Sequence, residues 1–162
     1  MILLRLNVVV GLLVWCLLGC RPNIDPALRP YVGLNKDHAR FLAMTVDQQM
    51  DTYLKVAALP LKPPDYSLSP LIATSNGNIG NSLAEHINHE SSGDRIIYLV
   101  RLAGDYCDLN ASCKGQHFLE EAVRTAITRI PEHLRNSYLE QNVKLVAEGV
   151  AGLPMQSPEP NH

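Results

Sequence analysis

Between residues 37 and 152, apolar side chains recur at intervals of three and four positions, which is the repeat of an α-helix with one buried face. The pattern is clearest in RIIYLVRLAGDY, which starts at Arg95, and in QHFLEEAVRTAITRI, which starts at Gln116. No stretch alternates apolar and polar residues, between turn signals, over enough positions to indicate a β-strand. The sequence therefore predicts an all-α fold.

Capping residues and prolines divide this region into segments. Thr45 and Gln48 stand three positions apart, as in a capping box, and predict that a helix begins directly after Thr45. Pro70 and Pro131 each suit the first turn of a further helix. We expect about five or six antiparallel helices in one domain, residues 36–152, as an irregular bundle or as a short stack of helix pairs resembling HEAT repeats.

The N-terminus has a different character. Arg5 supplies a positive charge, and an apolar run over residues 8–18 follows it, as in the n-region and h-region of a signal peptide. The run is too short for a transmembrane helix, which needs about 20 apolar residues. It ends in LLGC at residues 17–20, which resembles the lipobox of bacterial lipoproteins. The competing interpretation is an ordinary secretory signal that contains a chance cysteine.

The lipobox resemblance implies what becomes of the mature chain. It implies that residues 1–19 are a cleaved signal peptide and that acyl chains on Cys20 hold the protein to a lipid bilayer. Arg21 stands where similar lipoproteins carry a retention aspartate, which implies the outer membrane, with the protein facing the periplasm. We expect residues 20–35 to form a proline-rich tether with a reach of about 40 Å, and residues 153–162 to form a disordered tail.

Two cysteines, Cys107 and Cys113, remain once the others are assigned to the signal peptide and the anchor. An oxidising compartment outside the cytosol favours a disulfide between them. A redox pair usually has two residues between its cysteines, and a zinc site needs two further ligands at matching spacing. We therefore expect a structural disulfide that closes a short loop between two helices.

Charge and motif content disfavour several classes of function. The mature chain would carry 13 basic and 16 acidic side chains, which disfavours nucleic acid as a partner, because phosphate neutralisation needs a basic face. No G-x-S-x-G is present, and the glycine-rich segment at residues 76–82 lacks a phosphate-binding lysine, so no cofactor is expected. The six tyrosines fit either partly exposed contact surfaces or positions at the edge of the core.

The segment EHINHE, residues 85–90, is the candidate metal site. His86 and His89 lie three positions apart on a predicted helix, and Glu90 could act as a third ligand or as a base. The order of these residues matches neither H-E-x-x-H nor H-x-x-E-H.

Two hypotheses about function follow. The first is a non-enzymatic, membrane-anchored helical module that binds an envelope protein, as a secretion or envelope-assembly accessory or as an immunity protein against a toxin. The second is a metal-dependent hydrolase of envelope material that uses His86, His89 and Glu90. The sequence favours the first, because it contains no assembled catalytic set.

Overall fold

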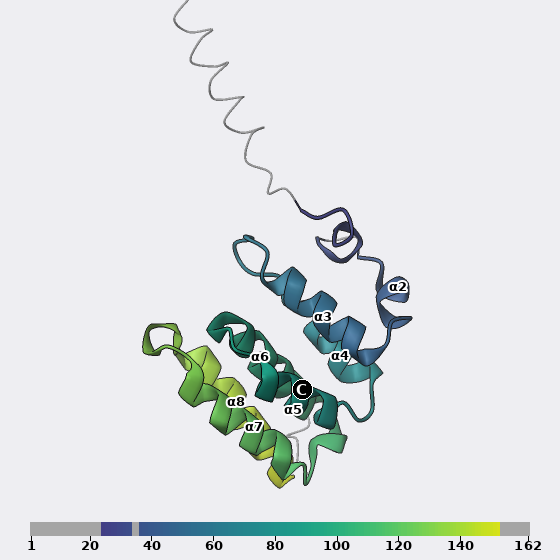
Figure 1. The fold of residues 1–162 in the computed structure, drawn as a ribbon. Coiled ribbons are helices and arrows are strands. Elements are labelled where there is room, and N and C mark those ends of the chain that lie inside the picture. Colours follow the sequence, from purple (N-terminus) through teal and green to yellow (C-terminus); the bar gives the residue numbers. More distant parts are fainter. Residues whose placement is uncertain (1–23, 34–35, 153–162) are drawn as a thin grey trace, which may run out of the picture.

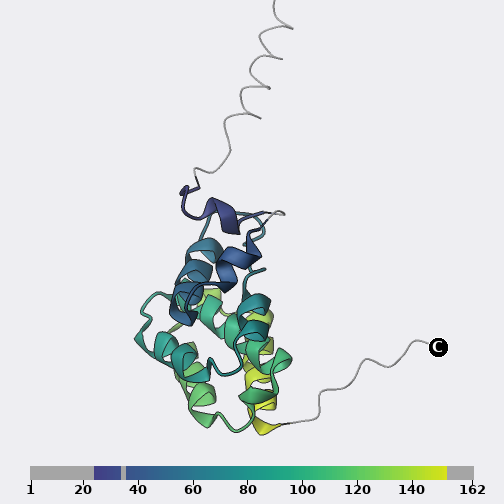
Figure 2. The same ribbon diagram turned by 90° about the vertical axis from the view of Figure 1, so that its right-hand side faces the viewer.

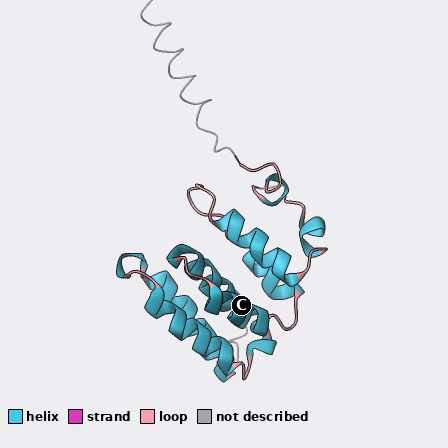
Figure 3. Ribbon diagram, in the orientation of Figure 1, coloured by secondary structure: helices cyan, strands magenta, loops and turns pink. Residues whose placement is uncertain are grey.

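A computed structural model describes residues 24–33 and 36–152, and every regular element in these two ranges is a helix (Figure 3). The all-α prediction is confirmed for this part of the chain. The α-helices are α2 (His38–Leu42), α3 (Val46–Ala57), α4 (Ser69–Ser75), α5 (Gly80–His89), α6 (Gly93–Leu109), α7 (His117–Arg129) and α8 (Ser137–Ala151), and the 3-10 helices are η1 (Arg29–Tyr31), η2 (Ala111–Cys113) and η3 (Glu132–Leu134). The described residues thus form seven α-helices, where about five or six were expected, and the five-residue α2 accounts for the difference.

Side-chain caps account for where two of the helices begin. At the start of α3, the Thr45 hydroxyl accepts from the Gln48 amide at 3.3 Å and the Gln48 side chain accepts from the Thr45 amide at 3.0 Å, so the predicted capping box is confirmed. The prediction that Pro131 opens the last helix is wrong. Pro131 has an extended backbone with ψ of 141°, and α8 begins six residues later, where the Asn136 side chain accepts from the Leu139 amide at 2.9 Å.

The alternate helices α4, α6 and α8 lie side by side in one row and run in the same direction. Gly104 of α6 faces Asn142 of α8, and farther along both helices Cys107 faces Gly149. Because the residue numbers rise together in these contacts, the two helices are parallel. The Ser69 hydroxyl of α4 donates to Asp105 of α6 at 2.5 Å. Farther along the same two helices, the side-chain amide of Asn110, just past α6, donates to the Ala73 carbonyl of α4. This packing matches the expected stack of helix pairs, because alternate helices form a row.

A second row packs against the first, on its near side in Figure 1, and contains α5 and α7. At one end of this row, the Gln116 side chain lies against Gly80 at the start of α5. At the other end, the Arg129 guanidinium donates to the carbonyls of Ile87, Asn88 and Glu90, at distances between 2.6 and 3.2 Å. Arg129 thereby satisfies carbonyls at the end of α5 that have no partner within their own helix.

The core centres on α6, which contributes eight buried residues. Ile96, Leu99, Val100 and Ala103, which the periodicity places on one face, are all fully buried, and so is Leu102. Because neighbours from both rows and from α3 pack on it, α6 is covered on more than one side. No helix in the described ranges combines the length and the apolar character needed to cross a bilayer.

The first described segment, residues 24–33, differs from the extended tether that its prolines suggest. It folds against the domain, with Tyr31 only 3% exposed and its ring 6.0 Å from that of Phe41. The Asp37 amide donates to the Pro30 carbonyl at 2.8 Å. The burial of one aromatic side chain in the core therefore outweighs the extended preference of the proline-containing segment. Cys20 and the predicted tail, residues 153–162, lie outside the described residues.

Candidate interaction surface

Two tyrosine rings enclose an arginine guanidinium at the surface where three segments meet. Arg101 lies in the middle of α6, Tyr66 in the loop between α3 and α4, and Tyr138 at the start of α8. The guanidinium carbon of Arg101 is 4.7 Å from the centroid of the Tyr66 ring and 4.9 Å from that of Tyr138. Both distances lie within the range of a favourable cation–π interaction.

An acidic residue one turn along α6 orients the guanidinium. Asp105 forms an ion pair with Arg101, with Oδ2 3.6 Å from Nε, and accepts a hydrogen bond of 2.5 Å from the Ser69 hydroxyl. Ser69 is fully buried, and the side chains of Arg101 and Asp105 are about one fifth exposed. The side chain of Arg101 is therefore held by its surroundings before any partner arrives.

Tyr98 extends this arrangement by one turn toward the start of α6, with its ring 5.8 Å from that of Tyr66. Burial raises the pKa values of both Tyr66 and Tyr98 above those of free tyrosine, so the two hydroxyls are protonated at neutral pH. Beneath them, the buried Tyr53 donates its hydroxyl to the Tyr98 carbonyl at 3.0 Å. We call Tyr66, Tyr98, Arg101 and Tyr138 the Tyr–Arg stack.

The composition of the Tyr–Arg stack suits recognition of another protein. Tyrosine and arginine are among the residues that contribute most to binding energy at protein interfaces, because they combine apolar area with directional polar groups. Tyr138 is 40% exposed, and Tyr66 and Tyr98 are half-buried. The six tyrosines thus divide between the two sequence-based interpretations: Tyr31, Tyr53 and Tyr106 are buried in the core, and the other three form the stack.

Sequence reasoning did not identify the stack. Helical periodicity relates positions within one helix, and it could not relate Arg101 to Tyr66 or Tyr138, which are 35 and 37 residues away. The one available signal was the excess of tyrosine over phenylalanine, which indicates no position.

The expected disulfide is present in the structure. Cys107, near the end of α6, is bonded to Cys113 of η2, with the two Cα atoms 5.0 Å apart, and both residues are buried. Gly149 of α8 lies directly against Cys107, and the Gly115 amide donates to the Val150 carbonyl. The bond thereby holds the turn against which the end of α8 packs.

The three residues of the candidate metal site are not brought together. Glu90 forms an ion pair with Arg95 at 2.8 Å, and its other oxygen accepts from the amides of Ser91 and Ser92. His86 faces Asp47 at 3.4 Å. Within residues 24–33 and 36–152, no three histidine, cysteine, aspartate or glutamate side chains gather closely enough to hold a metal ion.

The contact between His86 and Asp47 includes a serine but does not have the order of a catalytic triad. Asp47 accepts from the Ser82 hydroxyl at 2.7 Å, so the carboxylate lies between the serine and the histidine. A triad requires the histidine in the middle, where it can take the serine proton. The Ser82 hydrogen bond, with a smaller contribution from His86, lowers the pKa of Asp47, whose side chain is 74% exposed. This cluster links α3 to α5.

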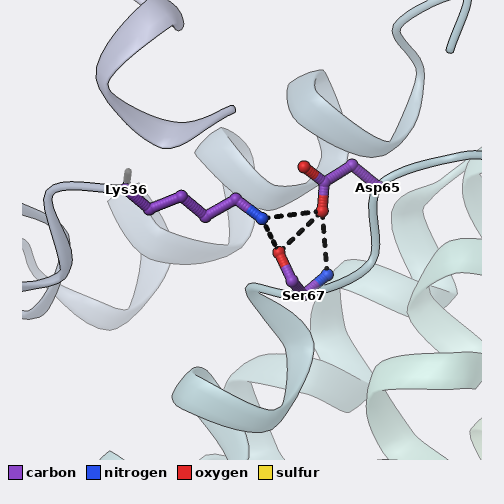
Figure 4. Close-up of polar contacts among 3 residues, drawn as sticks. All are labelled: Lys36, Asp65 and Ser67. Atoms are coloured by element: carbon purple, nitrogen blue, oxygen red, sulfur yellow. Dashed lines mark hydrogen bonds and ion pairs between the residues drawn. The ribbon is translucent and has the colours of Figure 1, made fainter. Parts of the chain in front are cut away.

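Lys36, Asp65 and Ser67 form a polar cluster (Figure 4) in which the side chains of the Lys36–Asp65 ion pair are only 8% and 16% exposed. The Lys36 ammonium is 2.9 Å from Asp65 and also donates to the Ser67 hydroxyl, which in turn donates to Asp65 at 2.6 Å. The ion pair with Asp65 and the hydrogen bonds through Ser67 fasten residue 36 to the loop before α4.

Comparison of the chain with protein-family models, with curated proteins and with solved structures found no match of any kind.

Proposed function

We propose that this protein is a non-enzymatic helical module that is anchored in the outer membrane through acyl chains on Cys20, faces the periplasm, and binds an envelope protein through the Tyr–Arg stack. Its role would be that of a secretion or envelope-assembly accessory, or of an immunity protein that blocks a toxin. The observation that carries the binding proposal is the guanidinium of Arg101, enclosed by Tyr66 and Tyr138 and oriented by Asp105.

Preorganisation is the physical reason for choosing this surface. A partner that contacts exposed lysines or glutamates must immobilise flexible side chains, which costs roughly 0.5–1.5 kcal/mol for each. The Arg101 side chain is already restrained by two rings and a carboxylate, so a partner would lose less free energy in ordering it. Tyr138, which is 40% exposed, is the member of the stack that a partner would meet first, with Tyr66 and Tyr98 half-buried beside it.

The anchor rests on the residues LLGC at positions 17–20 and has its own test. Mass spectrometry of protein taken from its native membranes should identify diacylglycerol thioether-linked to Cys20 and no peptide from residues 1–19. Cys20→Ala should release the protein from the membrane fraction. An unmodified Cys20 on a chain that retains Met1 would refute the anchor.

Photo-crosslinking in intact cells tests the binding surface. A photoreactive amino acid at position 138 should give one dominant protein adduct, and the same amino acid at Phe118 provides the control, because Phe118 is a similarly exposed aromatic residue on α7. The adduct at position 138 should be lost in the Tyr66→Ala variant if the stack acts as a unit. Equal adducts at both positions, or none at 138, would contradict the assignment.

A further inference from the structure

The anchor proposed at Cys20 would stand very close to the folded domain. The first described residue, Ile24, follows Cys20 by four positions, and a fully extended chain of that length spans at most about 14 Å. The described chain begins beside η1 and α2, at the opposite end of the molecule from the C-terminal end of α8 (Figures 1 and 2). The η1 and α2 end of the protein would therefore be the one nearest the bilayer.

Residues 24–33 cannot lengthen this connection without breaking buried contacts. Tyr31 would have to leave its position beside Phe41, and the hydrogen bond from the Asp37 amide to the Pro30 carbonyl would be lost. Beyond them, Lys36 is held by Asp65 in an ion pair whose side chains are 8% and 16% exposed. The segment therefore acts as part of the domain and not as a spacer.

The η1 and α2 end exposes apolar, basic and acidic side chains, the acidic ones being Asp25 and Asp37. Leu42, at the end of α2, is 42% exposed and is one of four large hydrophobic residues in the described ranges with this degree of exposure. Arg29 of η1 and Arg40 of α2 are also exposed, and so is His38. Apolar side chains beside basic ones bind the interface of a bilayer through burial and attraction to anionic headgroups.

The distribution of charge along the chain supports this orientation. Residues 20–43 carry four basic and two acidic side chains, whereas residues 44–162 carry nine basic and fourteen acidic ones. An anionic bilayer would attract the first part and repel the second. This difference in charge favours an orientation with the η1 and α2 end toward the membrane and the larger, acidic part away from it.

We infer that the η1 and α2 end, through its exposed Arg29, His38, Arg40 and Leu42, binds the headgroup layer of a bilayer that contains anionic lipid, which fixes the orientation of the domain on the membrane. The inference depends on the anchor at Cys20 proposed above. It adds a second membrane contact, made by the folded domain itself, and it leaves the Tyr–Arg stack free for a protein partner.

Energy transfer between the protein and the bilayer tests the inference. The full-length acylated protein, purified from its membranes, would be reconstituted into vesicles that carry a headgroup-linked acceptor, with a donor fluorophore on Ala39→Cys in α2 or on Thr125→Cys in α7. Both positions are exposed, and Cys107 and Cys113 are joined in a buried disulfide that does not react. We expect a several-fold higher transfer rate from residue 39 than from residue 125.

Charge reversal tests the role of the basic side chains. Arg29→Glu combined with Arg40→Glu should reduce the transfer rate from residue 39 several-fold in vesicles with an anionic phosphoglycerol lipid, because each basic side chain near such a surface strengthens association by about fivefold. Arg124→Glu combined with Lys144→Glu changes charge equally on exposed parts of α7 and α8 and should leave that rate unchanged.

The outcomes separate the anchor from the orientation. Mass spectrometry of the reconstituted sample reports acylation of Cys20 independently of energy transfer. Acylated protein with equal transfer from both positions, or with higher transfer from residue 125, would overturn the orientation while the anchor stands. An unacylated Cys20 would overturn both. A transfer rate from residue 39 that charge reversal at Arg29 and Arg40 leaves unchanged would overturn recognition of anionic lipid.

Discussion

Tyr53 illustrates how a single buried polar group constrains this protein. Its side chain is inaccessible to solvent, and its hydroxyl donates to the Tyr98 carbonyl at 3.0 Å. Burial strongly raises the pKa of the Tyr53 hydroxyl, because the phenolate would lose its hydration in the core. The folded protein therefore retains a proton that the unfolded chain releases above about pH 10.

Tyr53→Phe should lower the free energy of unfolding by about 1 kcal/mol at neutral pH, since it removes one buried hydrogen bond. The raised pKa gives a contribution to stability that is complete below about pH 10 and is lost as pH rises further. Urea unfolding followed by circular dichroism should therefore show a shallower alkaline loss of stability in the variant than in the wild type. Parallel alkaline profiles would contradict this explanation.

Asp65 shows the opposite dependence on pH. Its burial alone would raise the pKa, but hydrogen bonds from Ser67 and the ion pair with Lys36 outweigh burial and lower the pKa of Asp65. The carboxylate therefore contributes stability above about pH 4, and the contribution is lost as pH falls through the lowered pKa.

Asp65→Asn should destabilise the fold by roughly 3 kcal/mol at neutral pH, because it leaves the buried Lys36 ammonium without a counter-charge. It should also flatten the loss of stability in acid. Asp51→Asn is the matched control, since its ion pair with Lys55 is more than half exposed and should contribute no more than about 0.5 kcal/mol. Similar effects from both substitutions in urea unfolding would disprove the special role of the Lys36 pair.

At the scale of elements, α6 and α8 approach closely because each offers a glycine to the other. Gly104 of α6 receives the Asn142 side chain, and Gly149 of α8 receives Cys107. A Cβ atom at position 149 would lie 2.6 Å from Cys107 Cβ and 2.9 Å from its carbonyl oxygen. The disulfide holds that backbone in place, so the contact has little room to relax.

Gly149→Ala should lower the free energy of unfolding by about 1–2 kcal/mol. The clash with Cys107 outweighs the gain in helix propensity that alanine brings to α8. Gly77→Ala, where a Cβ meets no atom within 4 Å, should change stability by less than about 0.5 kcal/mol. Equal midpoints for the two variants in urea unfolding would show that α6 and α8 are not limited by this contact.

At the scale of the whole molecule, the two rows of helices are extended at their N-terminal end by a short segment, residues 24–33, which is docked on the domain. Within residues 24–33, Tyr31 alone is buried in the core that the two rows share, and the partly buried Leu28 and Val32 and main-chain hydrogen bonds around η1 complete the attachment. Local opening of the segment should therefore require less free energy than unfolding of the stack.

Tyr31→Ala should release this segment selectively. We expect hydrogen exchange of the Tyr31-region amides and of the Asp37 amide to accelerate by about a hundredfold, as truncation of a buried aromatic residue implies, while amides of α7 keep their wild-type protection. Exchange measured by mass spectrometry on proteolytic fragments reports both regions at once. Loss of protection in α7 as well would show that the segment and the stack unfold together.

Much of the helical content could be predicted from local patterns. The stripe through Ile96, Leu99 and Val100 predicted the helix that the structure has as α6, because three-and-four spacing is a property of one helix alone. The capping box at Thr45 and Gln48 was equally readable, since both partners lie within four residues. The cysteine pair followed from elimination among four cysteines.

The features that the sequence could not indicate involve contacts between residues that are distant in the chain, or residues that have more than one possible partner. Tyr66, Arg101 and Tyr138 come together only because α4, α6 and α8 stack in register. Glu90 was available to a metal site in the sequence, but in the folded chain it pairs with Arg95. Residues 24–33 have the composition of a tether, and only the space beside Phe41 decides that Tyr31 docks.

The sequence alone therefore determined that the chain is helical, where most of its helices lie and which cysteines pair. The helices follow from periodicity and capping residues, and the disulfide follows from the two cysteines that remain to form it. The tertiary structure alone decided which helices run parallel, which tyrosines reach the surface and where the N-terminal segment ends. Those outcomes depend on the fit of side chains from separate segments, such as Gly149 against Cys107, and no local pattern encodes that fit.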